Sequence, residues 1–310
     1  MGPTLRMGAR LTGGAVILGV LVWKLGSGPF VVGLGRVDGW SLVAAVLLAG
    51  VSTTCNAWRW VLVARVLGVP LQPRAALAAC YRSQLLNSLL PGGVLGDVHR
   101  GLRHGTDTGA RSAGLRAVLW ERVLGQLVLV AAAALLLVLV PTPLPTWLRA
   151  VLGVAGAGLV VVAVTPGVWP LPRDLHALLG APALGGVVPL SLGAVGCHVA
   201  TFLVAARVVG VTAPTATVVV LGVLALLAMS LPLNVAGWGP REGVAAWAFA
   251  AVGLGAGQGV STAVVYGVLG LVATLPGLVV LLLDRRAVAT PRPVDAGPVG
   301  PPEPAEVGRG

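Results

Sequence analysis

Long apolar runs separated by short polar stretches dominate the pattern of residues along the chain. A run of roughly 20 apolar residues can cross a bilayer as a helix. The pattern predicts six membrane-spanning helices, at 11–23, 40–64, 117–140, 147–167, 184–206 and 258–283. The first of them follows two arginines and resembles a signal peptide, but the small residues after it make no clear cleavage site. We therefore interpret it as an uncleaved first helix.

Two further apolar stretches are interrupted by residues that break helices. The first, 75–96, contains Pro91, Gly92 and Gly93, and the second, 214–255, contains Pro232, Asn234, Gly237, Gly239 and Pro240. Proline removes a helix donor, and glycine loosens the backbone. Broken backbone at membrane depth is tolerated only where protein or a water-filled cavity satisfies its polar groups. We therefore predict two re-entrant broken hairpins, and the alternative is eight plain spans, some of them short.

Basic residues gather on alternate sides of the spans, and this asymmetry predicts the orientation. Arginines lie before the first span, between the second and third, after the fourth and after the last. The opposite side carries only Lys24, Arg36, Arg149 and Arg207. Cytoplasmic loops are enriched in Lys and Arg. We therefore expect a multi-pass protein of the cell (plasma) membrane, with both termini and the loop at 98–116 in the cytoplasm.

The order of the predicted elements repeats along the chain. Each broken segment is preceded by two spans and followed by one, and the two segments face opposite sides of the membrane. The halves, about 1–140 and 141–286, therefore form a predicted inverted-topology repeat. Many secondary transporters have this layout, with a binding site at discontinuous helices near the midplane. Residues 287–310 are rich in Pro and Gly and are expected to form a disordered cytoplasmic tail after one transmembrane domain, 1–286.

Composition supports an all-α polytopic membrane protein and argues against other classes. The chain is 56% hydrophobic and 10% charged, whereas a soluble domain carries about a quarter charged residues. The net charge of +11 comes from arginines in short loops, which suits anionic lipid headgroups and not nucleic acid. The cysteines and histidines are scattered, so we expect no metal and no cofactor. The sequence has no phosphate-binding P-loop, which argues against an ATP-driven pump.

Three polar constellations interrupt the apolar background, and we predict that they bind a ligand. They are the first break with Asn87, Pro91, Gly92, Gly93, Gly96, Asp97 and Arg100, the pair Glu121 and Arg122, and the second break with Asn234, Gly237, Gly239, Arg241 and Glu242. Backbone N–H groups at a break can bind anions. Ionisable residues inside a span are costly unless paired, so they usually face the bundle interior. No catalytic residue is assigned.

Simpler interpretations of these charges remain open. The first break could be a cytoplasmic turn with solvated charges, and the second could be a purely structural hairpin. The pair at 121–122 could lie at the membrane interface and reach water. For Arg59, about a turn from the cytoplasmic end of its span, we expect such snorkelling.

At the three constellations the chain resembles a known family. The matching features are Asn-x-x-x-Pro-Gly-Gly…Gly-Asp-x-x-Arg at 87–100, Glu-Arg at 121–122 and Gly-x-Gly-x-x-Glu at 237–242. They resemble the lysylphosphatidylglycerol synthase transmembrane region, also called the flippase-like domain, over about 10–286. Two features depart from the family's pattern. Gly125 stands where the family often has Asp, and the second hairpin carries Trp238, Pro240 and Arg241 among its glycines.

The resemblance implies a domain that handles lipids with charged or sugar headgroups. In bifunctional relatives a soluble aminoacyl-transferase domain makes the lipid, and this kind of domain moves it across the bilayer. We see no such soluble domain, so we expect a transporter rather than an enzyme. The leading hypothesis is a translocase for a membrane phospholipid or polyprenyl-linked lipid with a charged or sugar-phosphate headgroup. The alternatives are a membrane-embedded transferase with Asp97 or Glu242 as base, and a non-catalytic partner of a glycosyltransferase or lipid synthase.

The predicted orientation can be tested by labelling. Cysteines introduced at positions 105 and 210 are expected to react with a membrane-impermeant thiol reagent from opposite sides, because the loops 98–116 and 208–213 are predicted on opposite faces. Labelling from the same side would contradict the inverted repeat.

Overall fold

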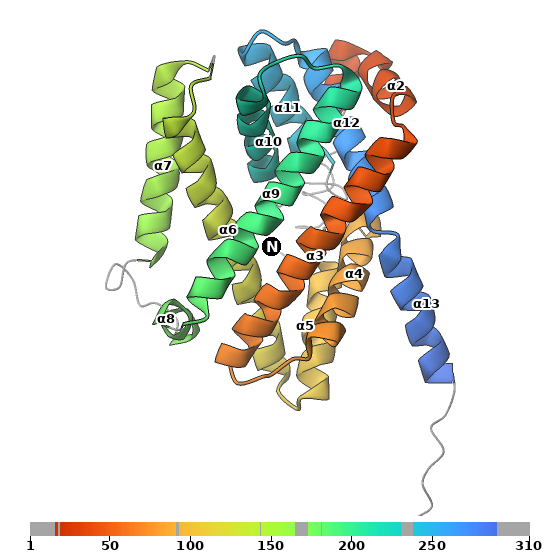
Figure 1. Cartoon of the computed structure of the whole chain (residues 1–310), viewed down its shortest axis with the longest axis vertical. Helices are drawn as coiled ribbons and strands as arrows, with labels where there is room; N and C mark the ends of the chain where they lie inside the picture. The colour runs from red at the N-terminus through yellow and green to blue at the C-terminus, as the bar shows by residue number, and fades with distance from the viewer. Residues whose placement is uncertain are drawn as a thin grey trace, which may run out of the picture.

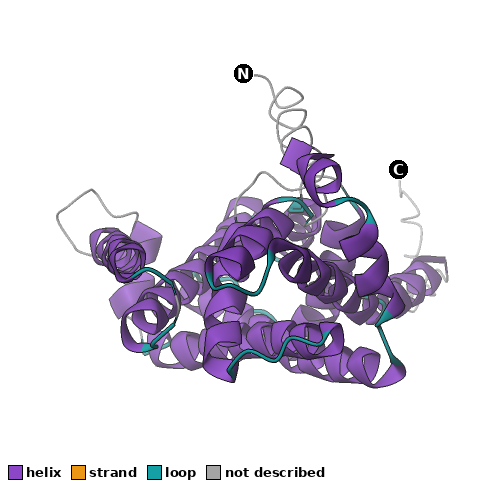
Figure 2. Ribbon diagram, turned by 90° about the horizontal axis from the view of Figure 1, so that it is seen from above, coloured by secondary structure: helices purple, strands orange, loops and turns teal. Residues whose placement is uncertain are grey.

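The computed structural model describes residues 16–17, 19–90, 93–142, 144–164, 173–180, 182–230 and 238–289. Within these ranges the regular elements are helices (Figure 2). Their bounds are α2 Gly28–Gly35, α3 Gly39–Val66, α4 Pro73–Leu89, α5 Leu95–Asp107, α6 Arg111–Leu139, α7 Thr146–Val164, α8 Arg173–Gly180, α9 Leu184–Val209, α10 Thr215–Met229, α11 Pro240–Ala251, α12 Ala256–Ala273 and α13 Pro276–Ala289.

Four helical stretches are long and apolar enough to cross a membrane. They are Gly39–Val66, Arg111–Leu139, Leu184–Val209 and Ala256–Leu283, and they correspond to four of the six predicted spans. The predicted span at 147–167 corresponds to α7, a shorter apolar helix, and residues 11–15 and 18 of the predicted first span lie outside the described residues. The predicted span at 258–283 is divided into α12 and α13 at Pro276, where proline cannot continue the preceding helix.

The helices α3 and α9 lie side by side at the centre of the molecule and run in opposite directions (Figure 1). Glycines on α9 allow this close contact. A Cβ on Gly186 would lie 2.8 Å from Leu62, and one on Gly193 would lie 3.3 Å from the Cys55 sulfur. Asp38 begins α3 by accepting a hydrogen bond of 2.8 Å from the backbone N–H of Ser41. This hydrogen bond stabilises the carboxylate and lowers the pKa of Asp38.

Two pairs of shorter helices lie towards opposite ends of the molecule. In Figure 1, α4 and α5 lie in the lower half and α10 and α11 in the upper half. The two helices of each pair pack against each other. Each predicted break falls between the members of a pair, and segments 91–92 and 231–237 at these breaks lie outside the described residues.

The arginine-rich segment 98–116 is mostly helical, and its prediction as a loop was wrong. The helix α5 continues to Asp107, and α6 already begins at Arg111. Small residues permit close packing here, since a Cβ on Gly114 would lie 2.6 Å from the backbone of Gly105. One imidazole nitrogen of the buried His104 lies 3.0 Å from the carbonyl oxygen of Val69. The polar residues of this segment therefore belong to a helix with one buried face.

The helix order of the first half returns in the second. The series α3, α4, α5 and α6 is followed by α9, α10, α11 and α12, about 142 positions later in the chain. For example, α4 begins at Pro73 and α10 at Thr215. In each series a long helix is followed by two shorter packed helices and then by another apolar helix.

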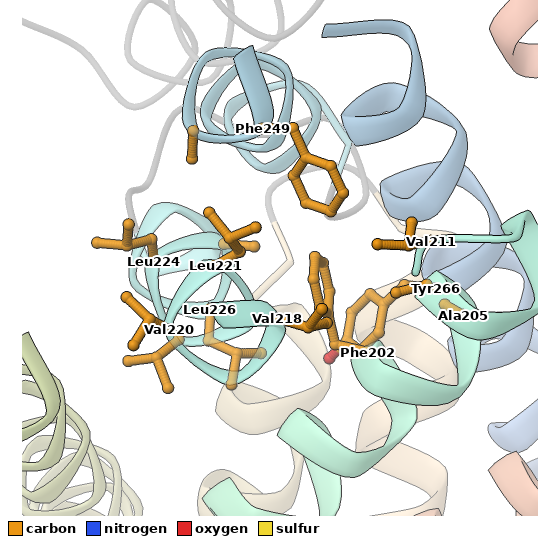
Figure 3. Packing of buried hydrophobic residues seen from close by; sticks show 14 of the residues in the cluster. Phe202, Ala205, Val211, Val218, Val220, Leu221, Leu224, Leu226, Phe249 and Tyr266 are labelled. Carbon is orange, nitrogen blue, oxygen red and sulfur yellow. The ribbon is translucent and has the colours of Figure 1, made fainter. Parts of the chain in front are cut away.

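An aromatic cluster joins the helices of the second series (Figure 3). The ring centroid of Phe202 on α9 lies 6.4 Å from that of Phe249 on α11 and 5.8 Å from that of Tyr266 on α12. On α10, Gly222 leaves room for this cluster, because a Cβ there would lie 2.9 Å from the Phe202 ring. The cluster fixes Tyr266 beside a group of buried charges.

The structure changes the positions suited to the labelling experiment. A Cβ at Gly105 would lie 2.5 Å from the Arg111 backbone, and Gly210 has a φ of +90°. Asp107 and Thr212 are exposed nearby. We expect Asp107→Cys and Thr212→Cys, in a chain without its native cysteines, to label from opposite membrane faces.

Candidate functional site

Charged side chains from three helices meet inside the first half, and we call this set the five-charge network. Its members are Arg59 of α3, Asp97 and Arg100 of α5, and Glu121 and Arg122 of α6. All except Arg122 are less than a tenth exposed, whereas half of the Arg122 side chain is exposed. Three arginines face two carboxylates, so the network has one excess positive charge.

Glu121 occupies the centre of the network. Its Oε1 accepts a hydrogen bond of 2.9 Å from Arg59 Nε, and its Oε2 accepts one of 2.7 Å from Arg100 Nη2. A carboxylate buried away from water is costly unless charges and hydrogen bonds compensate it. The two arginines supply this compensation and connect α3, α5 and α6. The prediction that Glu121 meets partners on other elements is confirmed.

Asp97 accepts hydrogen bonds at both of its carboxylate oxygens. Oδ1 accepts from Ser83 Oγ at 2.8 Å and from Arg100 Nε at 3.0 Å. Oδ2 accepts from Asn87 Nδ2 at 3.0 Å and from Arg122. Asp97 therefore pairs with two arginines of the network, Arg100 and Arg122.

A hydrogen bond between Asn87 and Gly96 joins the two sides of the first break. The Asn87 side chain accepts a hydrogen bond of 2.8 Å from the backbone N–H of Gly96. A Cβ at Gly96 would overlap the Ser83 carbonyl, so α4 and α5 could not approach as closely with any other residue there. Gly93 has a φ of +62°, a conformation that favours glycine.

Arg59 is buried and paired, and the prediction that it snorkels to water was wrong. Besides its bonds to Glu121, it donates one of 3.1 Å from Nη1 to Ser191 Oγ on α9. Its guanidinium lies against Gly125, where a Cβ would lie 2.9 Å from Arg59 Cζ. Gly125 is one of the positions where the chain departs from the family pattern, and here its missing side chain leaves room for the guanidinium.

Arg100 also packs against neutral side chains. Its guanidinium lies 4.6 Å from the centroid of the Trp60 ring, a cation–π contact. Arg100 Nη1 donates a weak hydrogen bond of 3.5 Å to the sulfur of Cys80. Cys80 is buried and contacts this charge.

A second group of buried charges lies at the second break. Glu242 Oε2 accepts a hydrogen bond of 2.7 Å from the backbone N–H of Gly239, and its Oε1 accepts one of 2.8 Å from Arg241 Nε. The Arg241 guanidinium lies 4.9 Å from the centroid of the Trp238 ring and 5.4 Å from that of Tyr266. Arg241 and Glu242 compensate each other's charge.

The two halves provide space for an arginine in the same way. A Cβ on Gly267 of α12 would overlap the Arg241 guanidinium, as one on Gly125 of α6 would crowd Arg59. These glycines are also separated by about 142 positions. They occupy equivalent places in the two series of helices.

Polar pairs across the α3–α9 contact lie next to both groups of charges. His198 of α9 bonds through Nδ1 to Tyr266 Oη at 3.1 Å and through Nε2 to Ser52 Oγ of α3 at 3.2 Å. Ser52 precedes Arg59 by about two helical turns, and His198 follows Ser191 by the same interval. The pairs Ser52–His198 and Arg59–Ser191 therefore lie on one antiparallel interface.

A small cavity of about 50 Å³ lies beside the five-charge network. It is lined by Asn56, Arg59, Cys80, Ser83, Gln84, Asp97, Arg100, Glu121 and Arg122. A cavity of this size holds a few waters, whereas sites for small organic ligands occupy about 300 Å³ or more. A lipid headgroup therefore cannot enter this cavity unless the helices move.

The structure brings most of the predicted site residues into two groups. One contains Asn87, Gly96, Asp97, Arg100, Glu121 and Arg122, and the other contains Gly239, Arg241 and Glu242. Pro91, Gly92, Asn234 and Gly237 lie outside the described residues. The hypothesis that both breaks form one site therefore stays a prediction.

Sequence reasoning missed several residues of these groups. Ser83 had a usable signal, since it lies one helical turn before Asn87 on the same face of α4. Tyr266 and His198 had no such signal in the sequence, because single polar residues in apolar spans are common. Whether two of them come into contact depends on how the helices pack.

Replacing Glu121 tests which charge stabilises the network. Glu121→Gln leaves two buried arginines without their carboxylate, and such a loss typically costs about 3–5 kcal/mol. We expect a much lower melting temperature of the detergent-purified protein. Arg122→Gln is the comparison, and its effect should be smaller because Arg122 is half exposed. Equal melting temperatures for the two variants would contradict the central role of Glu121.

The space beside Arg241 can be tested with two glycines of α12. Gly267→Ala places a methyl group against the Arg241 guanidinium, whereas Gly270→Ala meets nothing within 4 Å. Overpacking of this kind costs about 1–3 kcal/mol. We expect thermal unfolding to show destabilisation for Gly267→Ala alone, and a similar loss for Gly270→Ala would argue against a specific space for the guanidinium.

Comparison with known proteins identifies the family of the chain. No curated protein and no solved structure matches it. A family model described as the lysylphosphatidylglycerol synthase TM region matches residues 8–277. This range includes both groups of buried charges and the helices that hold them. The chain is therefore a multi-pass membrane protein that belongs to the lysylphosphatidylglycerol synthase TM region family.

Proposed function

We propose that this protein is a lipid translocase that moves a lipid with a charged or sugar-phosphate headgroup between the leaflets of the cell membrane. The observation that carries the proposal is the five-charge network with its excess positive charge. Charges at membrane depth are costly and commonly mark the path of a substrate or ion. Arginine matches the geometry of phosphate oxygens, so the excess charge suits a phosphate-bearing headgroup.

The proposed translocase has six spans, with α4–α5 and α10–α11 as re-entrant hairpins from opposite sides and both termini in the cytoplasm. The placement of these pairs towards opposite ends of the molecule supports this topology (Figure 1). So does the return of the helix order about 142 positions later. In such repeats, alternating access arises when one half rocks against the other. The cavity beside the five-charge network is too small for a headgroup in this conformation.

The positions of the acidic residues argue against the alternative of a membrane-embedded transferase. A general base must be free to accept a proton from its substrate. Asp97 accepts hydrogen bonds at both oxygens, two of them from arginines, and Glu242 is held by Arg241 and the Gly239 N–H. Both carboxylates are therefore already committed to internal partners.

Reconstitution tests the function directly. The full chain is placed in phosphatidylcholine vesicles with a trace of fluorescent phosphatidylglycerol, and an impermeant quencher reports the leaflet of the label, with and without an ion gradient. We expect faster exchange than in protein-free vesicles and no chemical change of the lipid by mass spectrometry. A changed lipid would indicate the transferase. Unchanged lipid without exchange would leave recruitment of a glycosyltransferase or lipid synthase as the remaining hypothesis.

Neutralising the buried acids links transport to the proposed site. Asp97→Asn and Glu242→Gln keep the size of the side chain but remove the charge that orients the arginines. We expect about tenfold or greater loss of lipid exchange, since hydrogen bonds between charged groups contribute about 1.5–3 kcal/mol. Asp107→Asn, at the exposed end of the same helix as Asp97, is the matched control. Wild-type exchange by folded Asp97→Asn and Glu242→Gln would place the site elsewhere.

A further inference from the structure

Arg122 differs from the other arginines of the five-charge network in its exposure. Arg59 and Arg100 are 7% and 3% exposed, and both donate to Glu121 and to further partners. The Arg122 side chain is 50% exposed. Its hydrogen bond to a described residue runs from Nη2 to Asp97. A guanidinium has five N–H donors, so the exposed part of Arg122 can bind a further acceptor.

A polar line continues from Arg122 along the surface of α6. Gln126 lies one turn further on the same face and is exposed. Its side-chain oxygen accepts a hydrogen bond of 3.1 Å from Ser230 Oγ. Ser230 is exposed at the end of α10, immediately before the second break. The three side chains therefore form an exposed line from the first hairpin to the second, across the contact between the two halves.

The surroundings of this line are apolar. The segment Arg111–Leu139 is hydrophobic enough to cross a membrane, and Leu119, about one turn before Arg122 on the same face of the helix, is exposed. Next to lipid chains, the remaining N–H donors of Arg122, beyond its bond to Asp97, and the N–H donors of Gln126 need a polar acceptor. A lipid headgroup can supply that group while its acyl chains stay in the bilayer.

The chemistry of the three residues indicates which headgroup fits. The guanidinium can donate two parallel hydrogen bonds to a phosphate, and the carboxamide of Gln126 has N–H donors for the next oxygen. The cavity of about 50 Å³ beside the five-charge network is too small for a headgroup. An open line on the surface has no such size limit.

We propose that Arg122, Gln126 and Ser230 form a track, one part of the path across the membrane, along which the phosphate of a lipid headgroup passes from the first half to the second. The phosphate binds at Arg122, passes Gln126 by replacing its bond to Ser230, and reaches the second hairpin. This inference rests on the proposed translocase function and specifies its ligand group and its path.

The chain offers a closely matched control for Arg122. Arg116 lies on the same helix, its side chain is 52% exposed, and its Nε lies 3.3 Å from a carboxylate oxygen of Asp174. Arg122 is 50% exposed and paired with Asp97. The two arginines thus lie on the same helix, have similar exposed fractions and each pair with an aspartate. Arg122 belongs to the five-charge network and the polar line, and Arg116 belongs to neither.

The experiment measures binding and exchange for Arg122→Gln, Gln126→Leu and Arg116→Gln. Binding of short-chain phosphatidylglycerol and of inorganic phosphate is measured on the purified full chain, and exchange in the vesicles described above. We expect Arg122→Gln to weaken lipid binding about tenfold or more. Gln126→Leu should slow exchange severalfold with binding near wild type, because it removes a step of the path and not the first contact. Arg116→Gln should match wild type in both assays.

Each outcome decides between specific alternatives. Wild-type binding and exchange by folded Arg122→Gln, or an equal loss in Arg116→Gln, would overturn the track. Inorganic phosphate that binds as tightly as the lipid would identify a soluble anion as the ligand and would also overturn it. If Arg122→Gln does not fold, Gln126→Leu decides, because it leaves the five-charge network intact. A further outcome is that the wild-type chain binds lipid but shows no exchange, and that Arg122→Gln loses this binding. That result would refute the translocase and the track, and it would leave a phosphate-binding site at Arg122.

Discussion

The fold depends on one carboxylate, that of Glu121, which two arginines hold in the interior of the first half. Because Arg59 comes from α3 and Arg100 from α5, the single side chain of Glu121 on α6 joins three helices. Hydrophobic packing gives little direction to helices that already lie in lipid, so close packing and polar contacts must determine how they meet. The network, together with the glycines around it, supplies that specificity where α3, α5 and α6 converge.

The sequence predicted the general architecture and most of the polar residues, but not their geometry. Long apolar runs located four membrane-crossing helices, and Pro and Gly located both breaks, because hydrophobicity and backbone chemistry act locally. Arg59 was misjudged, since its distance from the helix end suggested access to water and nothing local indicated the space at Gly125. The charges of segment 98–116 suggest a loop, whereas its small buried residues allow α5 and α6 to pack closely. The Tyr266–His198 bond requires knowledge of which helices touch.

The two halves pack an arginine in the same way but differ in charge. Each places an arginine against a glycine of a long helix, at Gly125 and at Gly267. In the first half the arginines outnumber the carboxylates, whereas in the second Arg241 and Glu242 compensate each other and two aromatic rings cover the guanidinium. The polar pairs on the α3–α9 interface join these unequal halves. The two halves therefore share an order of helices but differ in the charges at their breaks.

The single excess charge of the network bears on how the membrane voltage acts on the protein. Carrying one elementary charge through the full potential involves about 2.3 kcal/mol per 100 mV. A headgroup with one negative charge, bound to a network with one excess positive charge, forms an electroneutral pair. The electric field exerts no net force on this pair while the headgroup stays bound at Arg122. On the proposed track the headgroup leaves the network behind, so that step moves one negative charge through the field and its rate would depend on voltage. The empty network keeps its charge, and any motion that carries it across the field in the return step would be sensitive to the potential.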